Sequence, residues 1–261
     1  MNAIPLARPI VRIPLVAALA WVALGVLAKA AMVLIDFGND ASFRGASVIN
    51  PDPNGNYWNS MQPGFFYSNL LDTTNAATTI DFGFSTPVGT DSYNGPAGVT
   101  SFPPTAAEVN ATDINAAALG PLGVKAAAFD FAAENNCRFE IQQLDPSQLY
   151  TLTFFASHKF STDDATVFRV FSDNTYTTQI ASVSLNVQTP DSPNLHNRDT
   201  VATISNLQPQ ASNILYVQFS GANGGTGYLN SLQITSVPEP GSLAFLSTGA
   251  ALLLSLRRQR A

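Results

Sequence analysis

Short runs of alternating apolar and polar residues recur along most of the chain. Residues 181–187 place Val183, Leu185 and Val187 on one face, with serine and asparagine between them. A period of two is typical of a strand with one buried and one solvated face. Runs of this kind predict strands at 32–37, 79–84, 126–131, 138–142, 150–157, 166–172, 181–187, 200–204, 214–219 and 228–234.

The spacing of these runs indicates how the strands are arranged. They recur every 8–15 residues, with Gly, Pro, Asn and Ser between them. This spacing favours a single antiparallel β-sandwich over residues 32–235. In the run at 214–219, Leu215, Val217 and Phe219 are expected to face the core, and Tyr216 the opposite side.

One segment departs from the strand pattern. Thr105 and Glu108 form a capping box, alanines follow, and Gly120 supplies a stop. We expect one helix or two short helices over 106–119, a helical insert near 105–120. Two long loops, at 50–59 and 91–104, are rich in Pro, Gly and Asn, and such loops often carry function.

The N-terminal end of the chain has the features of a secretory signal peptide. Basic residues precede an apolar run at 13–28, and an Ala-Lys-Ala sequence follows it. We expect a signal peptide at 1–30, cut after Ala30 or, as second choice, after Ala31. The alternative is a permanent membrane helix, but the run is shorter than the ~20 residues that a full span prefers.

The C-terminal end of the chain also carries an apolar segment. The run at 243–256 would reach only ~21 Å as a helix, short of a ~30 Å hydrocarbon core. Two prolines precede it, so the folded body is expected to end near Thr235. The segment is flanked by Val237, Pro238, Glu239 and Pro240 before it and by Arg257, Arg258 and Arg260 after it.

The order of these three features resembles the PEP-CTERM sorting signal of Gram-negative bacteria over residues 237–261: a VPEP motif, a short membrane helix and a basic tail. The resemblance implies two processing partners, signal peptidase and an exosortase-type enzyme. The protein would be exported, anchored transiently in the inner membrane and passed to the cell surface or an extracellular matrix. The alternative is an ordinary C-terminal anchor.

The charge of the body excludes one class of partner. Only 11% of the chain is charged, and residues 32–235 hold six basic against 17 acidic side chains. Nucleic-acid binding requires a positive surface, so it is not expected. Cys137 is the only cysteine, so no intramolecular disulfide can form. We interpret Cys137 as a buried strand residue, with a reactive thiol as the alternative.

Three phrases of the body resemble galactose-binding-like jelly rolls, the β-sandwiches of many carbohydrate-binding modules. They are Ile35-Asp36-Phe37-Gly38 at the start, the run at 144–152 in the middle and the run at 227–234 at the end. The resemblance implies a jelly-roll-like sandwich, and it leaves the ligand open.

Familiar catalytic motifs are missing from the sequence: it has no GxSxG, HExxH or P-loop. The two histidines are predicted to lie near strand ends. If those ends are neighbours, His158, His196, Arg198 and Asp199 form one polar cluster. This cluster is a candidate binding or catalytic site, and a hydrogen-bond network that braces two loops is the alternative.

Sugar binding needs an aromatic ring with amide and carboxylate groups around it. Trp58 lies in a predicted loop between Tyr57 and Asn59, and Tyr93 forms a second such position. Trp58 has two possible roles: its ring contacts a ligand, or it packs at the end of the core.

No organic cofactor is expected, and a structural Ca²⁺ ion is the one inorganic candidate. The loops at 52–56 and 161–164 are rich in carboxylate and amide oxygens, which suit Ca²⁺. Solvated turns are the alternative.

Two functions follow from these features. The first is a non-catalytic surface or matrix protein that binds extracellular polysaccharide. The second is an extracellular hydrolase that acts on carbohydrate or its esters. The missing catalytic motifs favour the first.

Overall fold

The computed structural model describes residues 31–92, 94, 101–159, 165–188, 196–210 and 212–238. The expected signal peptide, Tyr93, the loop at 161–164 and the tail from Glu239 onward lie outside these ranges. Residues 30–237 form one compact unit. None of the helices in the described ranges has the length and apolar character needed to cross a membrane.

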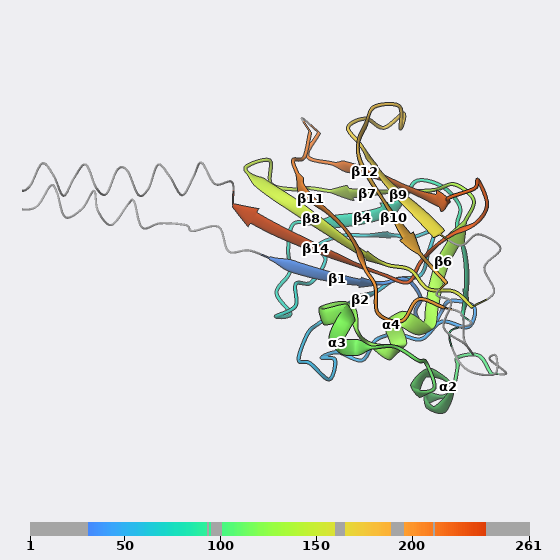
Figure 1. Ribbon diagram of the computed structural model, residues 1–261. Coiled ribbons are helices and arrows are strands. Elements are labelled where there is room, and N and C mark those ends of the chain that lie inside the picture. Colours follow the sequence, from blue (N-terminus) through green and yellow to red (C-terminus); the bar gives the residue numbers. More distant parts are fainter. Residues whose placement is uncertain are drawn as a thin grey trace, which may run out of the picture. The chain divides into compact units, whose positions relative to one another are not determined.

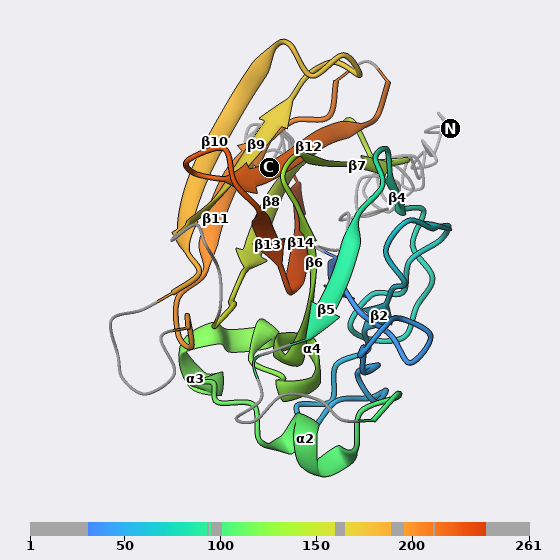
Figure 2. The same ribbon diagram turned by 90° about the vertical axis from the view of Figure 1, so that its right-hand side faces the viewer.

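The described part of the chain is mainly β, in several antiparallel sheets (Figures 1 and 2). Its strands are β1 (Met32–Asp36), β2 (Asn59–Ser60), β3 (Phe66–Tyr67), β4 (Asp81–Phe84), β5 (Gly89–Ser92), β6 (Asp130–Glu134), β7 (Cys137–Gln142), β8 (Gln148–Phe155), β9 (Ala165–Phe171), β10 (Gln179–Asn186), β11 (Ala202–Leu207), β12 (Leu215–Gly221), β13 (Gly227–Leu229) and β14 (Ser231–Pro238). Its helices are α2 (Ala106–Asn110), α3 (Ala116–Leu119), α4 (Lys125–Phe129) and the short 3₁₀ helix η1 (Gly120–Leu122).

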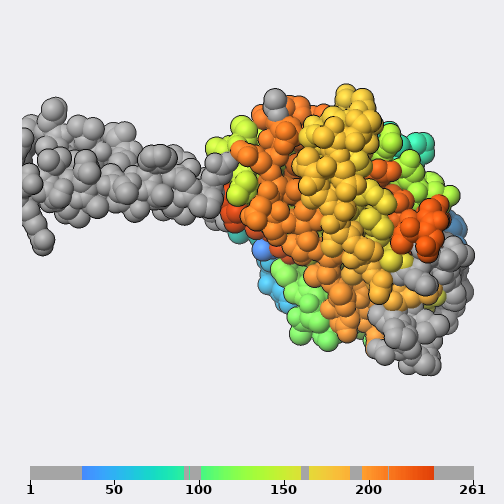
Figure 3. All heavy atoms as spheres, turned by 45° about the horizontal axis from the view of Figure 1, so that its top comes forward, coloured from blue at the N-terminus to red at the C-terminus, as the bar shows by residue number. Residues whose placement is uncertain are grey.

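The strands form three sheets. A five-stranded sheet has the order β11-β8-β14-β1-β2, a six-stranded sheet the order β10-β9-β12-β7-β4-β3, and a small sheet the order β13-β6-β5. Pairing is largely antiparallel, and β1 with β2 is a parallel pair. The edge strands β10 and β11 contact each other, and Figure 3 shows the yellow β9–β10 hairpin beside orange β11 on one face of the molecule.

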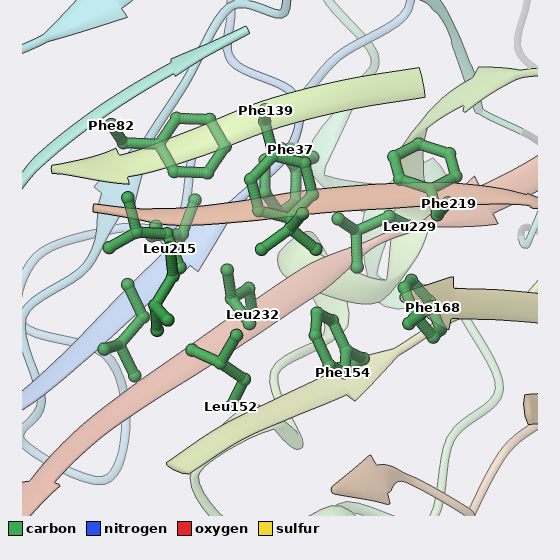
Figure 4. Packing of buried hydrophobic residues seen from close by; sticks show 14 of the residues in the cluster. Phe37, Phe82, Phe139, Leu152, Phe154, Phe168, Leu215, Phe219, Leu229 and Leu232 are labelled. Carbon is green, nitrogen blue, oxygen red and sulfur yellow. The ribbon is translucent and has the colours of Figure 1, made fainter. Parts of the chain in front are cut away.

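The two larger sheets contribute side chains to one buried cluster (Figure 4). The five-stranded sheet supplies Leu152, Phe154 and Leu232, and the six-stranded sheet supplies Phe168 and its neighbours. The rings of Phe154 and Phe168 stack across the cluster with centroids 4.2 Å apart. Apolar burial of this extent is the main stabilising contribution to the fold.

A second cluster lies on the other face of the five-stranded sheet. There α3, η1 and α4 cover Leu34 of β1 and Phe155 of β8, as the lower part of Figure 1 shows. Strand β1 is therefore buried on both faces. Phe155, which alternates with the core residue Phe154, is fully buried by this helical cover.

The helical insert is confirmed as two short helices. Thr105 caps α2 and closes the expected capping box with Glu108. Gly120 ends α3 at a φ of 60°, where a residue without a side chain is favoured.

One strand prediction is wrong, and another is interrupted by a break. The run at 126–131 forms helix α4 followed by the start of β6, because alanine is the strongest helix former and short apolar runs have no decisive period. The run at 228–234 is split at Asn230 between β13 and β14, which belong to different sheets. Strand β14 also continues past Thr235 to Pro238, because the φ of proline suits an extended strand end.

The aromatic centre of the core generates a stability prediction. The ring of Phe139 is fully buried, 5.0 Å from the ring of Phe82 and 6.4 Å from that of Phe37. Phe139→Ala should lower the free energy of unfolding by about 3–5 kcal/mol in urea denaturation, because it leaves a cavity. The matched change at exposed Phe65 should cost less than about 0.5 kcal/mol. Equal losses in the two variants would contradict this description of the core.

Candidate functional site

The loop at 50–59 is closed by its own polar side chains. The carboxylate of Asp52 accepts hydrogen bonds from the backbone N–H groups of Asn54 (2.8 Å) and Asn56 (2.9 Å) and from Nε1 of Trp58 (2.9 Å). The amide of Asn50 binds the backbone N–H and C=O of Trp58. Both carboxylate oxygens of Asp52 are therefore occupied by hydrogen bonds within the loop. This occupancy does not favour the loop as a Ca²⁺ site.

Trp58 is 1% exposed and packs in the second cluster against Leu34 and Phe155. Its ring faces are covered, which favours packing over ligand contact. Asn59 also has a structural role: its amide donates to the C=O groups of Leu34 and Leu71 and accepts from the N–H of Leu71. Tyr57 beside it is half-buried, and its N–H donates to the C=O of Thr73.

The two histidine segments are neighbours, which is the condition that the polar cluster requires. The C=O of Val187 accepts hydrogen bonds from the backbone N–H groups of His158 (3.2 Å) and Asn197 (2.9 Å). The side chains, however, turn to different partners. The ring of His158 packs between Phe131 and Tyr228, with centroids 4.6 and 4.4 Å away.

The second histidine, His196, lies in a loop that contacts the segment around Asp113. Nε2 of His196 lies 2.9 Å from the C=O of Asp113, and Arg198 forms an ion pair with the carboxylate of Asp113 at 3.1 Å. This ion pair is partly exposed, so it contributes little stability. The carboxylate of Asp199 accepts a hydrogen bond from Thr200. These contacts favour bracing of two loops over a catalytic cluster.

The outer face of the six-stranded sheet carries a row of residues that the sequence analysis did not single out. The register places Phe66 opposite Gly83, Gly83 opposite Glu140, Glu140 opposite Tyr216, and Tyr216 opposite Phe171. Their neighbours along each strand, such as Phe82, point into the core, so the row faces outward.

One end of this row is covered by the loop between β9 and β10. Tyr176 lies over it with ring centroids 5.5 Å from Phe171 and 5.9 Å from Tyr216, and the guanidinium of Arg138 lies 4.5 Å above the Tyr176 ring. Burial raises the pKa of Tyr176 to about 12. Asp173 shapes the loop by accepting backbone N–H hydrogen bonds at its turn.

The other end of the row is open. We call it the open sheet face and define it by Phe66, Asp81, Gly83, Glu140 and Gln142. Phe66 is 55% exposed and lies against Gly83, where any Cβ would come within 2.6 Å of the ring. Gln142 donates to Glu140 at 2.6 Å, and both side chains are half-exposed. The sequence signal for this face was the pair Phe65-Phe66 after a glycine.

A pocket of about 340 Å³ lies between the loop at 48–54 and the helical insert. Its lining is mostly apolar, from Val48, Ile49 and Val124 among others, and Nζ of Lys125 donates to the C=O of Asn110 at its rim. The volume is at the lower end for small-molecule sites, and the described lining offers no aromatic ring for a sugar.

The acidic, histidine and cysteine side chains are the remaining candidates for metal binding or reactivity. Within the described ranges, no group of three or more His, Cys, Asp and Glu side chains is arranged to hold a metal ion. Cys137 is buried in β7, and burial raises the pKa of its thiol above the ordinary value. A reactive thiolate is therefore disfavoured, and the prediction that this residue is buried is confirmed.

Comparisons with known proteins add little. No family model and no curated protein matches the chain. Among solved structures, an arabinose-bound GH51 α-L-arabinofuranosidase is similar over 59% of this chain, at a TM-score of 0.29 and 11% identity. The match covers 23% of the enzyme's chain. A likeness at this level carries no argument about activity.

The burial of His158 leads to a prediction about acid stability. Burial lowers its pKa from 6.5 to about 4, so between these pH values the unfolded chain binds more protons than the folded one. This contribution to stability is complete above pH 6.5 and is lost as the pH falls toward 4, by at most about 1.4 kcal/mol per pH unit. His158→Phe, which keeps an aromatic ring against Phe131 and Tyr228, should remove this part of the pH dependence in urea denaturation. An unchanged slope would contradict it.

Proposed function

We propose that this is an exported protein of the cell surface or extracellular matrix, and that its body binds polysaccharide without catalysis. The observation that carries the binding proposal is the open sheet face, where an exposed aromatic ring lies beside a carboxylate and an amide on a regular sheet. The export proposal is independent and comes from the two ends of the sequence.

The open sheet face has the groups that a sugar requires. The apolar face of a pyranose packs on an aromatic ring, and its hydroxyls pair with carboxylate and amide groups. Phe66 offers the ring, 55% exposed. Glu140 is held in position by hydrogen bonds from Gln142 and Ser85, so its carboxylate is oriented before a ligand arrives.

We further propose that the two larger sheets form a jelly-roll-like β-sandwich of the galactose-binding-like kind. Their shared core cluster supports this proposal, as do the antiparallel pairings around it. In such a sandwich the outer face of one sheet is free for a ligand, in agreement with the position of the open sheet face.

The last strand of the body leads directly into the proposed sorting motif. Strand β14 extends to Pro238, so the VPEP motif begins within the last strand. Cleavage near this motif by an exosortase-type enzyme would release the body close to its final paired residues. Signal peptidase would act at the other end, near Ala30.

Binding is tested with the purified full-length chain on a glycan array and by isothermal titration against the polysaccharides it selects. Phe66→Ala and Glu140→Gln should each weaken binding at least about tenfold, because each removes one component of the contact. Phe43→Ala is the matched control, since this ring is 59% exposed but lies outside the open sheet face.

Three results would count against this proposal: no glycan bound by the wild-type chain, equal losses in the Phe43 variant, or unchanged affinity in both test variants. Turnover of a chromogenic glycoside or ester, abolished by Glu140→Gln, would favour the hydrolase alternative instead.

Export is tested by cell fractionation and mass spectrometry of the mature protein. Replacing Pro238, Glu239 and Pro240 by alanine should leave an unprocessed C-terminus and retain the protein in the inner membrane. The unmodified chain should lack the tail and appear at the surface or in the medium. An intact chain in the cytosol would refute the export proposal.

A further inference from the structure

Two aspartates meet inside the protein without a basic partner among the described contacts. Asp36 ends β1 and Asp130 begins β6, and both are essentially unexposed. Their carboxyl groups lie within hydrogen-bonding reach of each other. Gly38 packs directly on the pair, because a Cβ at this position would come within 1.9 Å of the Asp130 carboxylate.

One oxygen of each carboxylate is held by the protein. Oδ2 of Asp36 accepts hydrogen bonds from Oγ of Ser60 at 2.8 Å and the N–H of Val48 at 3.2 Å. Oδ2 of Asp130 accepts one from the N–H of Ala46 at 2.8 Å. The remaining oxygen of each group, Oδ1, is buried and accepts no hydrogen bond from the described residues.

A third buried oxygen lies beside this pair and was placed there by the strand register. Ser231 is directly opposite Asp36 in the β1–β14 ladder, so the two side chains lie on the same face of the sheet. Ser231 is fully buried, and its Oγ has no hydrogen-bond partner within the described ranges. A buried hydroxyl without a partner is costly unless something else binds it.

We propose that Asp36, Asp130 and Ser231 bind one Ca²⁺ ion. Two carboxylates can both stay charged in a buried position only if a cation balances them, and one divalent ion balances both. Oxygen ligands suit a hard cation, and the larger, more adaptable shell of Ca²⁺ tolerates a hydroxyl and backbone carbonyls better than Mg²⁺ does. The hydrogen bonds to the Oδ2 atoms then orient the two ligands from outside, as is usual at metal sites.

A proton is the competitor of the cation at this site. Burial, together with the nearby charges of Asp130 and Asp40, raises the pKa of the two carboxyls, that of Asp130 to about 8. Ca²⁺ must therefore compete with protons for the two carboxyls.

The ion would stabilise the segment at 38–48. The N–H groups of Ala46 and Val48 are bound by the same two carboxylates, and Val48 also lines the apolar pocket. Ca²⁺ would thus join the ends of β1, β6 and β14 and position one wall of that pocket.

The test uses the full-length chain, stripped with EDTA and titrated with CaCl₂ at pH 7.5. We expect one Ca²⁺ per chain by isothermal titration and a thermal midpoint that rises with Ca²⁺ and falls again with EDTA. Asp36→Asn should weaken Ca²⁺ binding at least tenfold, and Asp199→Asn, the matched change in another loop, should leave it unchanged. If Asp36→Asn fails to fold, Ser231→Ala is the second variant, with severalfold weaker binding expected.

Two outcomes would overturn the proposal. One is a thermal midpoint that does not respond to millimolar Ca²⁺, which would leave a shared proton as the account of the pair. The other is full Ca²⁺ binding in Asp36→Asn or Ser231→Ala, which would place the ion elsewhere.

Discussion

The buried side chain of Asn230 holds together the segments around which the fold is built. Its amide donates to the C=O groups of Ala128 (3.2 Å) and Asp130 (2.7 Å), and its Oδ1 accepts from the N–H of Ser157 (2.7 Å). The backbone N–H of Asn230 binds the C=O of Phe155. One residue thus fixes where β13 gives way to β14, where α4 becomes β6 and where β8 ends. The meeting of Asp36 and Asp130 depends on this arrangement.

The same solution recurs in loops and at the start of β2. Asn50, Asn59 and Asn197 each bind backbone groups of segments that would otherwise be left unpaired. An amide has a donor and an acceptor, so one side chain can satisfy an N–H and a C=O without the desolvation cost of a charge. Such amides help a chain with 11% charged residues to order its loops, together with carboxylates such as that of Asp52. The Asp36–Asp130 pair differs from these sites because two carboxyl groups are buried next to each other.

Sequence patterns predicted those features of the structure that depend on residues close together in the chain. Alternation identified most strands, and the capping box at Thr105 identified the start of α2. The break at Asn230 was missed because residues 228–234 predict one continuous strand. The break is determined by side-chain partners 73 to 102 residues earlier in the chain. The open sheet face was missed for a similar reason. The environment of Phe66 is determined by Gly83 on another strand, and β3 itself has two residues.

The width of the open sheet face limits what it can bind. The outward row crosses five strands, but Tyr176 covers the part over β9 and β12, which leaves β3, β4 and β7. Three adjacent strands span about 10 Å. Contact is therefore restricted to a short stretch of a polysaccharide, and one copy of the protein should bind it weakly. Many copies held at a surface or within a matrix would engage the same polymer together, and this multivalency would strengthen attachment without any further contact in the protein.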